Sequence, residues 1–188
     1  GSRPAEVARL LPVEIEAARR LETAIGPCSF IIPAPTPTTR RAVAAILARL
    51  PHKPATLAVS DGQSRHILRQ AEAAVVKSGT STLEASLLLC PCTVVYQVSS
   101  ATYAIARRLV KGLKHVGLVN ILAGREVCRE LIQGAMTPEA IEAEMRRILD
   151  DAAYRAAMLD GMREVNARVG LPGATARAAT VVLEEIPV

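Results

Sequence analysis

Apolar residues along this chain recur in two patterns, one typical of amphipathic helices and the other of short buried strands. The first helical pattern covers Glu6–Leu21, with Pro4 near its start and Gly26 after its end. The run Ser29–Pro33 follows and is too short for a helix, but its aromatic and β-branched residues favour a buried strand. The same alternation continues through most of the chain.

The remaining predicted elements fall into two groups. Helices are expected at Thr38–Leu50, Ser64–Ala71, Ser81–Leu89, Ala101–Val110, Glu126–Gln133, Pro138–Asp150, Ala152–Val169 and Ala174–Glu185. Strands are expected at Thr56–Ser60, Ala74–Lys77, Thr93–Gln97 and Val116–Val119. Short strands that alternate with helices predict an α/β fold, with a Rossmann-like parallel sheet flanked by helices. We expect one domain over residues 1–188, with the helices from about residue 138 packing against it.

The composition narrows the class of protein. Half of the residues are apolar, but no apolar run approaches the roughly 20 residues that cross a bilayer. No secretory signal is visible either, so we expect a cytoplasmic protein. The four cysteines lie in apolar surroundings without the spacing of a metal site, and we interpret them as reduced packing residues. They are Cys28, Cys90, Cys92 and Cys128. The three histidines show no ligand spacing, so we predict no bound metal.

The net charge is +5, and part of it is concentrated in one short segment. The segment contains Arg107, Arg108, Lys111, Lys114 and His115. Such a cluster suits phosphate, nucleic acid or an anionic lipid surface, and it also fits a solvated helix face. Nucleic acid is the weakest alternative, because one Phe, three Tyr and no Trp leave few residues on which bases could stack.

Ligands of open parallel sheets bind beyond the carboxyl ends of the strands, so the residues that follow each strand are the candidates. The most informative segment reads AVVKSGTSTLE, from Ala74 to Glu84. Its strand runs through a turn of small residues directly into a helix, which would direct backbone N–H groups and the positive helix end at a diphosphate. Gly79 allows close approach of the backbone, and Ser78 and Thr80 offer hydroxyl groups.

A structural alternative exists for the same segment. Ser81 and Glu84 also fit a capping box, in which the serine caps the helix and the glutamate reaches back to the cap. From the residues alone, the two interpretations remain open. The glycine-rich patterns of dinucleotide and P-loop sites are absent, which disfavours NAD and ATP.

Other segments extend this pattern over the chain. The chain opens with GSR at Gly1–Arg3, and it reads RRLVK at Arg107–Lys111, VNILAGRE at Val119–Glu126 and ELIQ at Glu130–Gln133. Together with SGTSTLE, and in this order, they resemble the lipid-A-disaccharide synthases. The resemblance runs through nearly the whole chain.

The resemblance implies the C-terminal half of a two-domain glycosyltransferase of the GT-B type. Such enzymes transfer a diacylated glucosamine from UDP to the 6-hydroxyl of an acylated glucosamine phosphate, with inversion and without a metal or other cofactor. They act on the cytoplasmic face of the inner membrane, so the resemblance implies peripheral membrane contact through Arg107, Arg108, Lys111 and Lys114. The acceptor and the catalytic base are expected in an N-terminal domain that this chain does not contain, so the chain alone should not catalyse transfer.

Donor-binding roles are carried over to nine residues. Ser78, Gly79, Thr80 and Ser81 correspond to the loop at the diphosphate. Arg3 would add positive charge there, and Glu84 would lie near the ribose hydroxyls. Three further residues correspond to positions that face the donor cleft, namely Asn120, Glu130 and Gln133. The alternative for these three is that Asn120 caps a helix and that the other two are solvated.

Two other functions remain as alternatives. One is another UDP-sugar enzyme, such as a UDP-N-acetylglucosamine 2-epimerase, although the histidines do not follow strands in a suitable pattern. The other is a nucleotide-sugar-binding module that has kept the fold and lost the chemistry. A homo-oligomer is also left open, and the acyl-chain length cannot be predicted.

Overall fold

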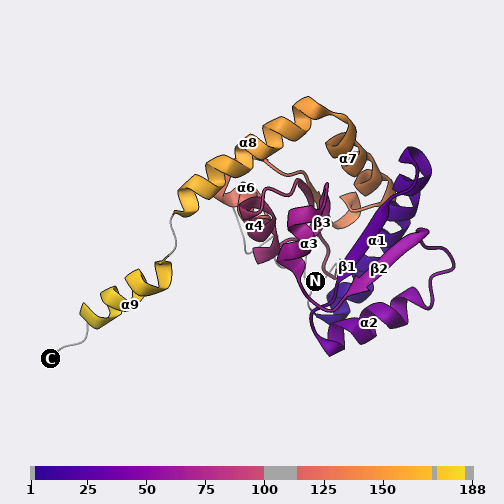
Figure 1. Ribbon diagram of the computed structural model, residues 1–188, viewed down its shortest axis with the longest axis horizontal. Coiled ribbons are helices and arrows are strands. Elements are labelled where there is room, and N and C mark those ends of the chain that lie inside the picture. The colour runs from indigo at the N-terminus through magenta and orange to yellow at the C-terminus, as the bar shows by residue number, and fades with distance from the viewer. Residues whose placement is uncertain (1–2, 100–113, 171–172, 185–188) are drawn as a thin grey trace.

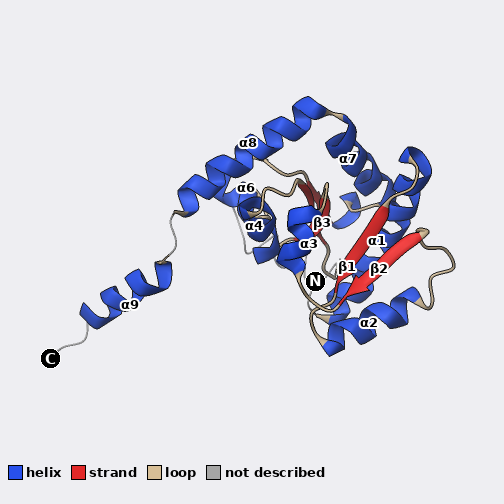
Figure 2. Cartoon of the chain, viewed as in Figure 1, coloured by secondary structure: helices blue, strands red, loops and turns tan. Residues whose placement is uncertain are grey.

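The computed structural model describes residues 3–99, 114–170 and 173–184. The helix expected at Ala101–Val110 lies outside these residues, as do Gly1, Ser2 and three of the clustered cations. The elements follow one another as α1 (Pro4–Ile25), β1 (Ser29–Pro33), α2 (Pro37–Leu47), β2 (Thr56–Ser60), α3 (Ser64–Gln70), β3 (Ala74–Lys77), α4 (Thr80–Leu87), β4 (Cys92–Tyr96), α6 (Leu118–Ala123), β5 (Glu130–Ile132), a 3₁₀ turn (Gln133–Ala135), α7 (Pro138–Asp150), α8 (Ala152–Val169) and α9 (Ala174–Glu184). Figures 1 and 2 show strands surrounded by helices.

All strand pairs in the described residues are parallel, which confirms the predicted α/β class. The strands form two hydrogen-bonded groups, β1 with β2 and β3 with β4 and β5. In the larger group β4 is central, and Val76 of β3 pairs with Val94, which pairs on its other side with Glu130 of β5. Helices α4 and α7 both pack on β3 and β4, and Figure 1 shows them on opposite sides of these strands.

Capping residues fix where several helices begin. Thr137 caps α7 by accepting a hydrogen bond from Ala140 N at 3.1 Å, and Pro138 occupies the first helical position. The observed start agrees with the helix predicted over Pro138–Asp150, and the threonine side chain satisfies an N–H group that the helix cannot. Asp151 caps α8 in the same way through Tyr154 N at 2.9 Å.

Helix α1 contributes to two separate apolar cores. Leu10, Ala17 and Leu21 join the core of β3, β4, α7 and α8, where Val94 and Val95 are fully buried. A second stripe of the same helix packs with Ala34 and Val43 under β1 and α2, and this stripe consists of Val7, Leu11 and Ile15. Residues four and seven positions apart lie on one helix face, so each set forms one stripe. At 3.6 residues per turn the two stripes lie on adjacent faces, roughly 100° apart around the axis. Helix α1 therefore joins the two groups of strands.

The structure corrects the predicted strand at Val116–Val119 and the predicted helix at Glu126–Gln133. Leu118 and Val119 begin helix α6, and the fifth strand is instead Glu130–Ile132. Val127 and Leu131 are both buried and four residues apart, a spacing that imitates a helix. Their segment instead extends alongside β4, where Val94 N donates to Arg129 O at 2.8 Å.

The cysteines are confirmed as free packing residues. Cys90, Cys92 and Cys128 are buried, and Cys28 is half-buried. Burial raises the pKa of the Cys90 thiol to about 11, so it stays protonated and unreactive at neutral pH. Among the described helices, none is long and apolar enough to cross a membrane. Figure 1 shows α9 extending away from the rest of the protein, with Val181 and Val182 exposed.

Candidate functional site

The segment that follows β3 is held in place from both sides. Ser78 N donates to Val95 O of the neighbouring strand at 2.9 Å. The Ser78 hydroxyl donates to Val116 O at 2.7 Å, and the Thr82 hydroxyl donates back to Gly79 O at 2.8 Å. The turn from strand to helix is therefore fixed by contacts of its ends, and the residues between them are left open to a ligand.

Gly79 is the residue that makes this turn possible. It has φ 145° and ψ −157°, a conformation that residues with a Cβ rarely adopt. A Cβ built on it would meet nothing within 4 Å, so the space beside Gly79 is open. The glycine is thus required by the backbone conformation, and the space beside it is available for a bound group.

The capping-box alternative is not what the structure contains. Gly79 is the N-cap of α4 and no side chain caps this end, because Ser81 lies inside the helix at its second position. Among the described residues, the backbone N–H groups of Gly79, Thr80 and Ser81 have no hydrogen-bond partner. Thr80 and Ser81 are also exposed. An α4 end with three available N–H donors and two hydroxyl groups is suited to an anion.

Glu84 lies one turn further along α4 and is partly exposed. Its Oε1 is 3.6 Å from the guanidinium of Arg65, whose side chain is 79% exposed. Arg65 belongs to α3, which follows the carboxyl end of β2, so a second strand end contributes a residue beside the Ser78–Ser81 segment. Arg65 could not be selected from the sequence, because an arginine in a short helix gives no signal of its own.

Arg3 lies at the N-cap of α1, where it shares the carboxylate of Glu6 with Lys77. The Oε1 atom of Glu6 is 3.8 Å from Arg3 Nη1 and 3.1 Å from Lys77 Nζ. Lys77 is the last residue of β3 and immediately precedes Ser78. Partial burial acts to raise the pKa of Glu6, but the hydrogen bond and charge of Lys77, with Arg3 adding to them, hold it below its ordinary value.

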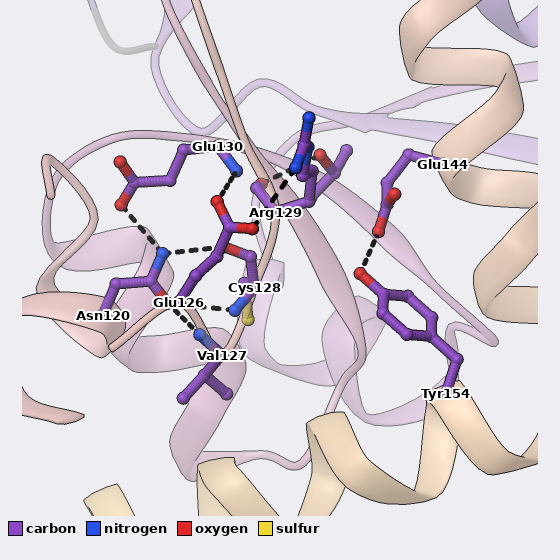
Figure 3. A network of polar contacts seen from close by, with 9 residues as sticks. Asn120, Glu126, Val127, Cys128, Arg129, Glu130, Glu144 and Tyr154 are labelled. Atoms are coloured by element: carbon purple, nitrogen blue, oxygen red, sulfur yellow. Dashed lines mark hydrogen bonds and ion pairs between the residues drawn. The ribbon is translucent and has the colours of Figure 1, made fainter. Parts of the chain in front are cut away.

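Asn120 is fully buried and uses its entire hydrogen-bonding capacity. Its Nδ2 donates to Cys128 O at 2.7 Å and to Glu130 Oε1 at 2.8 Å. Its Oδ1 accepts from Val127 N at 2.8 Å and from Cys128 N at 2.9 Å. Figure 3 shows this amide between α6 and the segment that leads into β5. An asparagine with two donors and two acceptors in use holds the framework and has no spare group for a ligand in this conformation.

Glu130 extends this arrangement towards the Ser78–Ser81 segment. Its carboxylate accepts from Val116 N at 3.0 Å and from Gly117 N at 2.9 Å, and so caps α6 from outside the helix. A Cβ added to Gly117 would approach Glu130 Oε1 to 3.2 Å, so a glycine permits the close contact. The peptide held in this way is the one whose carbonyl accepts the Ser78 hydroxyl. We call the set Asn120, Val127, Cys128, Glu130, Val116 and Gly117 the Asn120–Glu130 network.

Gln133 follows β5 and pairs with the backbone beyond β4. Its Oε1 accepts from Val98 N at 2.7 Å and its Nε2 donates to Val98 O at 3.2 Å, as a peptide group of a paired strand would. Its backbone φ is 54°, which is unusual for a residue other than glycine. The structural alternatives for these three residues are wrong. Asn120 lies within α6 and does not cap it. Glu130 and Gln133 are not simply solvated, because both are partly buried and hydrogen-bonded.

The structure thus separates the predicted site residues into two groups. Gly79, Thr80 and Ser81 leave backbone donors available at the carboxyl end of β3, and Glu84 lies on the same helix. Ser78 anchors this segment through its N–H and its hydroxyl group. Asn120, Glu130 and Gln133 are engaged by the protein itself. Among the described residues, no group of three or more His, Cys, Asp or Glu side chains could hold a metal ion.

Comparison with known proteins places this arrangement in a family. A family model described as Lipid-A-disaccharide synthetase matches residues 1–178. The chain belongs to this family. The lipid-A-disaccharide synthase of Anaeromyxobacter dehalogenans is 46% identical over 97% of this chain and 47% of its own length. That of Myxococcus xanthus is 42% identical over 100% of the chain and 48% of its own length. The resemblance inferred from the sequence is confirmed.

More distant relatives give the same coverage. The lipid-A-disaccharide synthase of Geobacter sulfurreducens is 35% identical over 98% of the chain and 47% of its own length. The chain therefore spans about half the length of the curated relatives it matches. A crystal structure described as the glycotransferase of kitacinnamycin covers 97% of the chain and 41% of its own chain, with a TM-score of 0.57 and 18% identity. This likeness concerns the fold, and it is consistent with one half of a GT-B glycosyltransferase.

Proposed function

We propose that the chain is the donor-binding half of a lipid-A-disaccharide synthase and that it holds the UDP portion of a UDP-linked diacylated glucosamine. The observation that supports the proposal most directly is the available N-terminal end of α4 after β3, in a chain that belongs to this family. Three backbone N–H groups without partners and two exposed hydroxyl groups surround an open glycine there. Few ligands match such a set of donors as well as a diphosphate does.

The proposed chemical role is to stabilise UDP as the leaving group. Negative charge grows on the diphosphate as the bond between the sugar and the phosphate breaks. The N–H groups of Gly79, Thr80 and Ser81 are already oriented by α4, so they oppose this charge without rearrangement. The positive end of the helix acts in the same direction. Arg3 adds a full positive charge, and the site therefore needs no metal ion for this step.

Glu84 is proposed to bind the ribose. Carboxylate oxygens are acceptors only, and two neighbouring hydroxyl groups are matching donors. Arg65 of the adjacent α3 lies within ion-pair distance of Glu84 and would help to orient it. The nine donor-site residues would then divide their work. Those around Gly79 contact the nucleotide, and Asn120, Glu130 and Gln133 hold the backbone that supports them.

The acceptor side is proposed to lie in a second domain. The curated relatives are about twice as long as this chain. We infer that the acylated glucosamine 1-phosphate acceptor and the catalytic base bind there, with the reaction at the cytoplasmic face of the inner membrane. Of the cationic cluster, the structure describes Lys114, which is exposed, and His115, which is half-buried, both shortly before α6. Lys114 would lie on the membrane-facing side.

A nucleotide titration in EDTA tests the proposed function. Isothermal calorimetry with UDP should show binding that does not change when divalent metal is removed. Gly79→Val provides the control, because a β-branched residue cannot adopt the Gly79 backbone conformation, and its side chain would occupy the open space. Absence of binding at millimolar UDP, in a sample shown to be folded by circular dichroism, would overturn the proposal. Equal affinity in Gly79→Val would move the site elsewhere.

A further inference from the structure

Lys77 occupies a position at the strand end that the donor-site residues identified above leave unexplained. It is the last residue of β3, its side chain is 26% exposed, and it is directly followed by Ser78. Its ammonium group is 3.1 Å from Glu6 Oε1 and 5.9 Å from the centroid of the Tyr96 ring, at the end of β4. The lysine is therefore held from one side by a carboxylate and from another by an aromatic ring.

The charges around Lys77 do not balance. Glu6 is the carboxylate within ion-pair distance of both Arg3 and Lys77 in the described residues, so two cations share one anion. The ammonium group has three N–H donors, and one of them is used by Glu6. This leaves a net positive charge and two donors at the carboxyl end of the strands, next to the available N-terminal end of α4. Lys77 comes two residues before Gly79, the N-cap of α4, so its charge belongs to the same turn between strand and helix.

We propose that Lys77 is a further donor-site residue, whose ammonium group contacts the diphosphate of the bound nucleotide, and that Glu6 is the positioning residue that holds Lys77 and Arg3 in place. The inference rests on the proposed function. The diphosphate would then contact a charged side chain at the end of β3 as well as the backbone donors of α4. Part of the affinity for the nucleotide would therefore come from Lys77 and would fall as the salt concentration rises.

The alternative is that the Lys77–Glu6 pair only ties α1 to β3. A second ion pair of α1 provides a matched control for this alternative. Arg20 pairs with Glu139 of α7 at 2.5 Å, four helical turns away from Glu6. If Lys77 acts only by tying α1 to its neighbours, Arg20→Met should resemble Lys77→Met in both stability and nucleotide binding.

Calorimetry with uridine, UMP and UDP on the unaltered chain, Lys77→Met and Arg20→Met separates these possibilities. Lys77→Met should lower the affinity for UDP by roughly 10- to 100-fold, the range expected for a hydrogen bond to a charged group. Its affinity for uridine should not change, and Arg20→Met should bind all three as the unaltered chain does. Equal UDP affinity in Lys77→Met and the unaltered chain would overturn the inference, and so would an equal loss for uridine.

Acetylation of the unaltered protein provides a second measurement that needs no folded variant. With acetic anhydride and mass spectrometry, saturating UDP should slow the acetylation of Lys77, because an ammonium group in contact with the diphosphate is shielded from the reagent and held in its charged, unreactive form. Lys53 precedes β2 at the opposite end of the strands and should react equally with and without UDP. Uridine should protect neither lysine. Unprotected Lys77 under saturating UDP overturns this inference alone, whereas failure of the unaltered chain to bind UDP overturns the proposed function and this inference with it.

Discussion

The Ser78–Ser81 segment and the Asn120–Glu130 network are connected through Val116, yet they use their polar groups in opposite ways. In the first, Ser78 anchors the segment, but the backbone N–H groups from Gly79 to Ser81 lack partners in the described residues. The hydroxyl groups of Thr80 and Ser81 also lack partners there. In the second, the Asn120 amide makes four hydrogen bonds within the protein. A motif in which donors remain available is suited to recognition, and one in which they are used is suited to support. Both kinds of residue would be retained in an enzyme, for different physical reasons.

The largest expected effect concerns the buried amide. Asn120→Ala leaves two backbone N–H groups, a carbonyl and part of the Glu130 carboxylate without partners, so the free energy of unfolding should fall by about 3 kcal/mol or more. Urea denaturation followed by circular dichroism measures it. Ser78→Ala, at a partly exposed position, should cost about 1 kcal/mol or less by comparison. A loss below about 1 kcal/mol for Asn120→Ala would contradict a supporting role.

The next effect concerns nucleotide affinity and Gly79. Gly79→Val should weaken UDP binding by about 2 kcal/mol, roughly 30-fold, because the valine displaces the backbone donors from their present orientation. The free energy of unfolding should fall less than in Asn120→Ala, since no buried group loses its partner. Calorimetry and thermal melts on the two variants test this contrast. The comparison fails if Asn120→Ala impairs binding more than Gly79→Val in samples that remain folded.

Glu84→Gln should have a smaller and more selective effect. An amide is a weaker acceptor than a carboxylate, so UDP affinity should fall by about 1.5 kcal/mol while the melting temperature stays unchanged. A titration with 2′-deoxy-UDP sharpens this test. If Glu84 binds the ribose, the variant and the unaltered chain should bind the deoxy nucleotide with similar affinity. An equal loss of affinity for both nucleotides would show that Glu84 does not contact the ribose 2′-hydroxyl.

The link between the two regions should be measurable as a coupling energy. Glu130→Gln loosens the peptide at Val116, and Ser78→Ala removes the hydroxyl that bonds to it. If the connection supports binding, the double variant should lose less UDP affinity than the sum of the two single losses. The expected difference is about 1 kcal/mol. Additive losses within about 0.3 kcal/mol would show that the regions act independently.

The smallest expected effect separates helix capping from ligand binding at Ser81. Because Gly79 is the N-cap and Ser81 lies within α4, Ser81→Ala should change the free energy of unfolding by less than about 0.5 kcal/mol. Loss of a true N-cap would cost about 1 kcal/mol. Thermal melts distinguish the two values, with Thr137→Ala at the capped start of α7 as the positive control. A melt of Ser81→Ala lowered as far as that of Thr137→Ala would restore the capping interpretation.

Local patterns were sufficient to predict much of the fold. Helix α7 spans Pro138–Asp150 and α8 spans Ala152–Val169, both with the bounds that were predicted from the sequence. The fifth strand was missed because it is three residues long and its pairing with β4 is a contact between distant parts of the chain. No local spacing contains that contact, and Val127 and Leu131 happen to match a helix.

The same limit applies to the site. The Gly79 turn could be predicted, because a strand, small residues and a helix in succession determine which groups are available. Lys77 could not be selected from the sequence, because its partner Glu6 lies 71 residues away. Asn120 could be singled out by resemblance, but only the structure shows that its amide is used internally. Sequence reasoning identified residues that matter without showing whether they contact a ligand or support those that do.

Helix α1 carries a consequence for how the protein unfolds. Its two apolar stripes belong to different cores, so neither core can lose its packing without exposing part of the same helix. The two groups of strands should therefore melt in a single cooperative transition, although within the described part of the chain no strand pairing joins them into one sheet. Arg3 and Glu6 form the first turn of this helix, at the site proposed for the diphosphate. A nucleotide bound there would bind only the folded state, in which α1 packs against both cores. Binding would therefore raise the midpoint of unfolding for both cores at once.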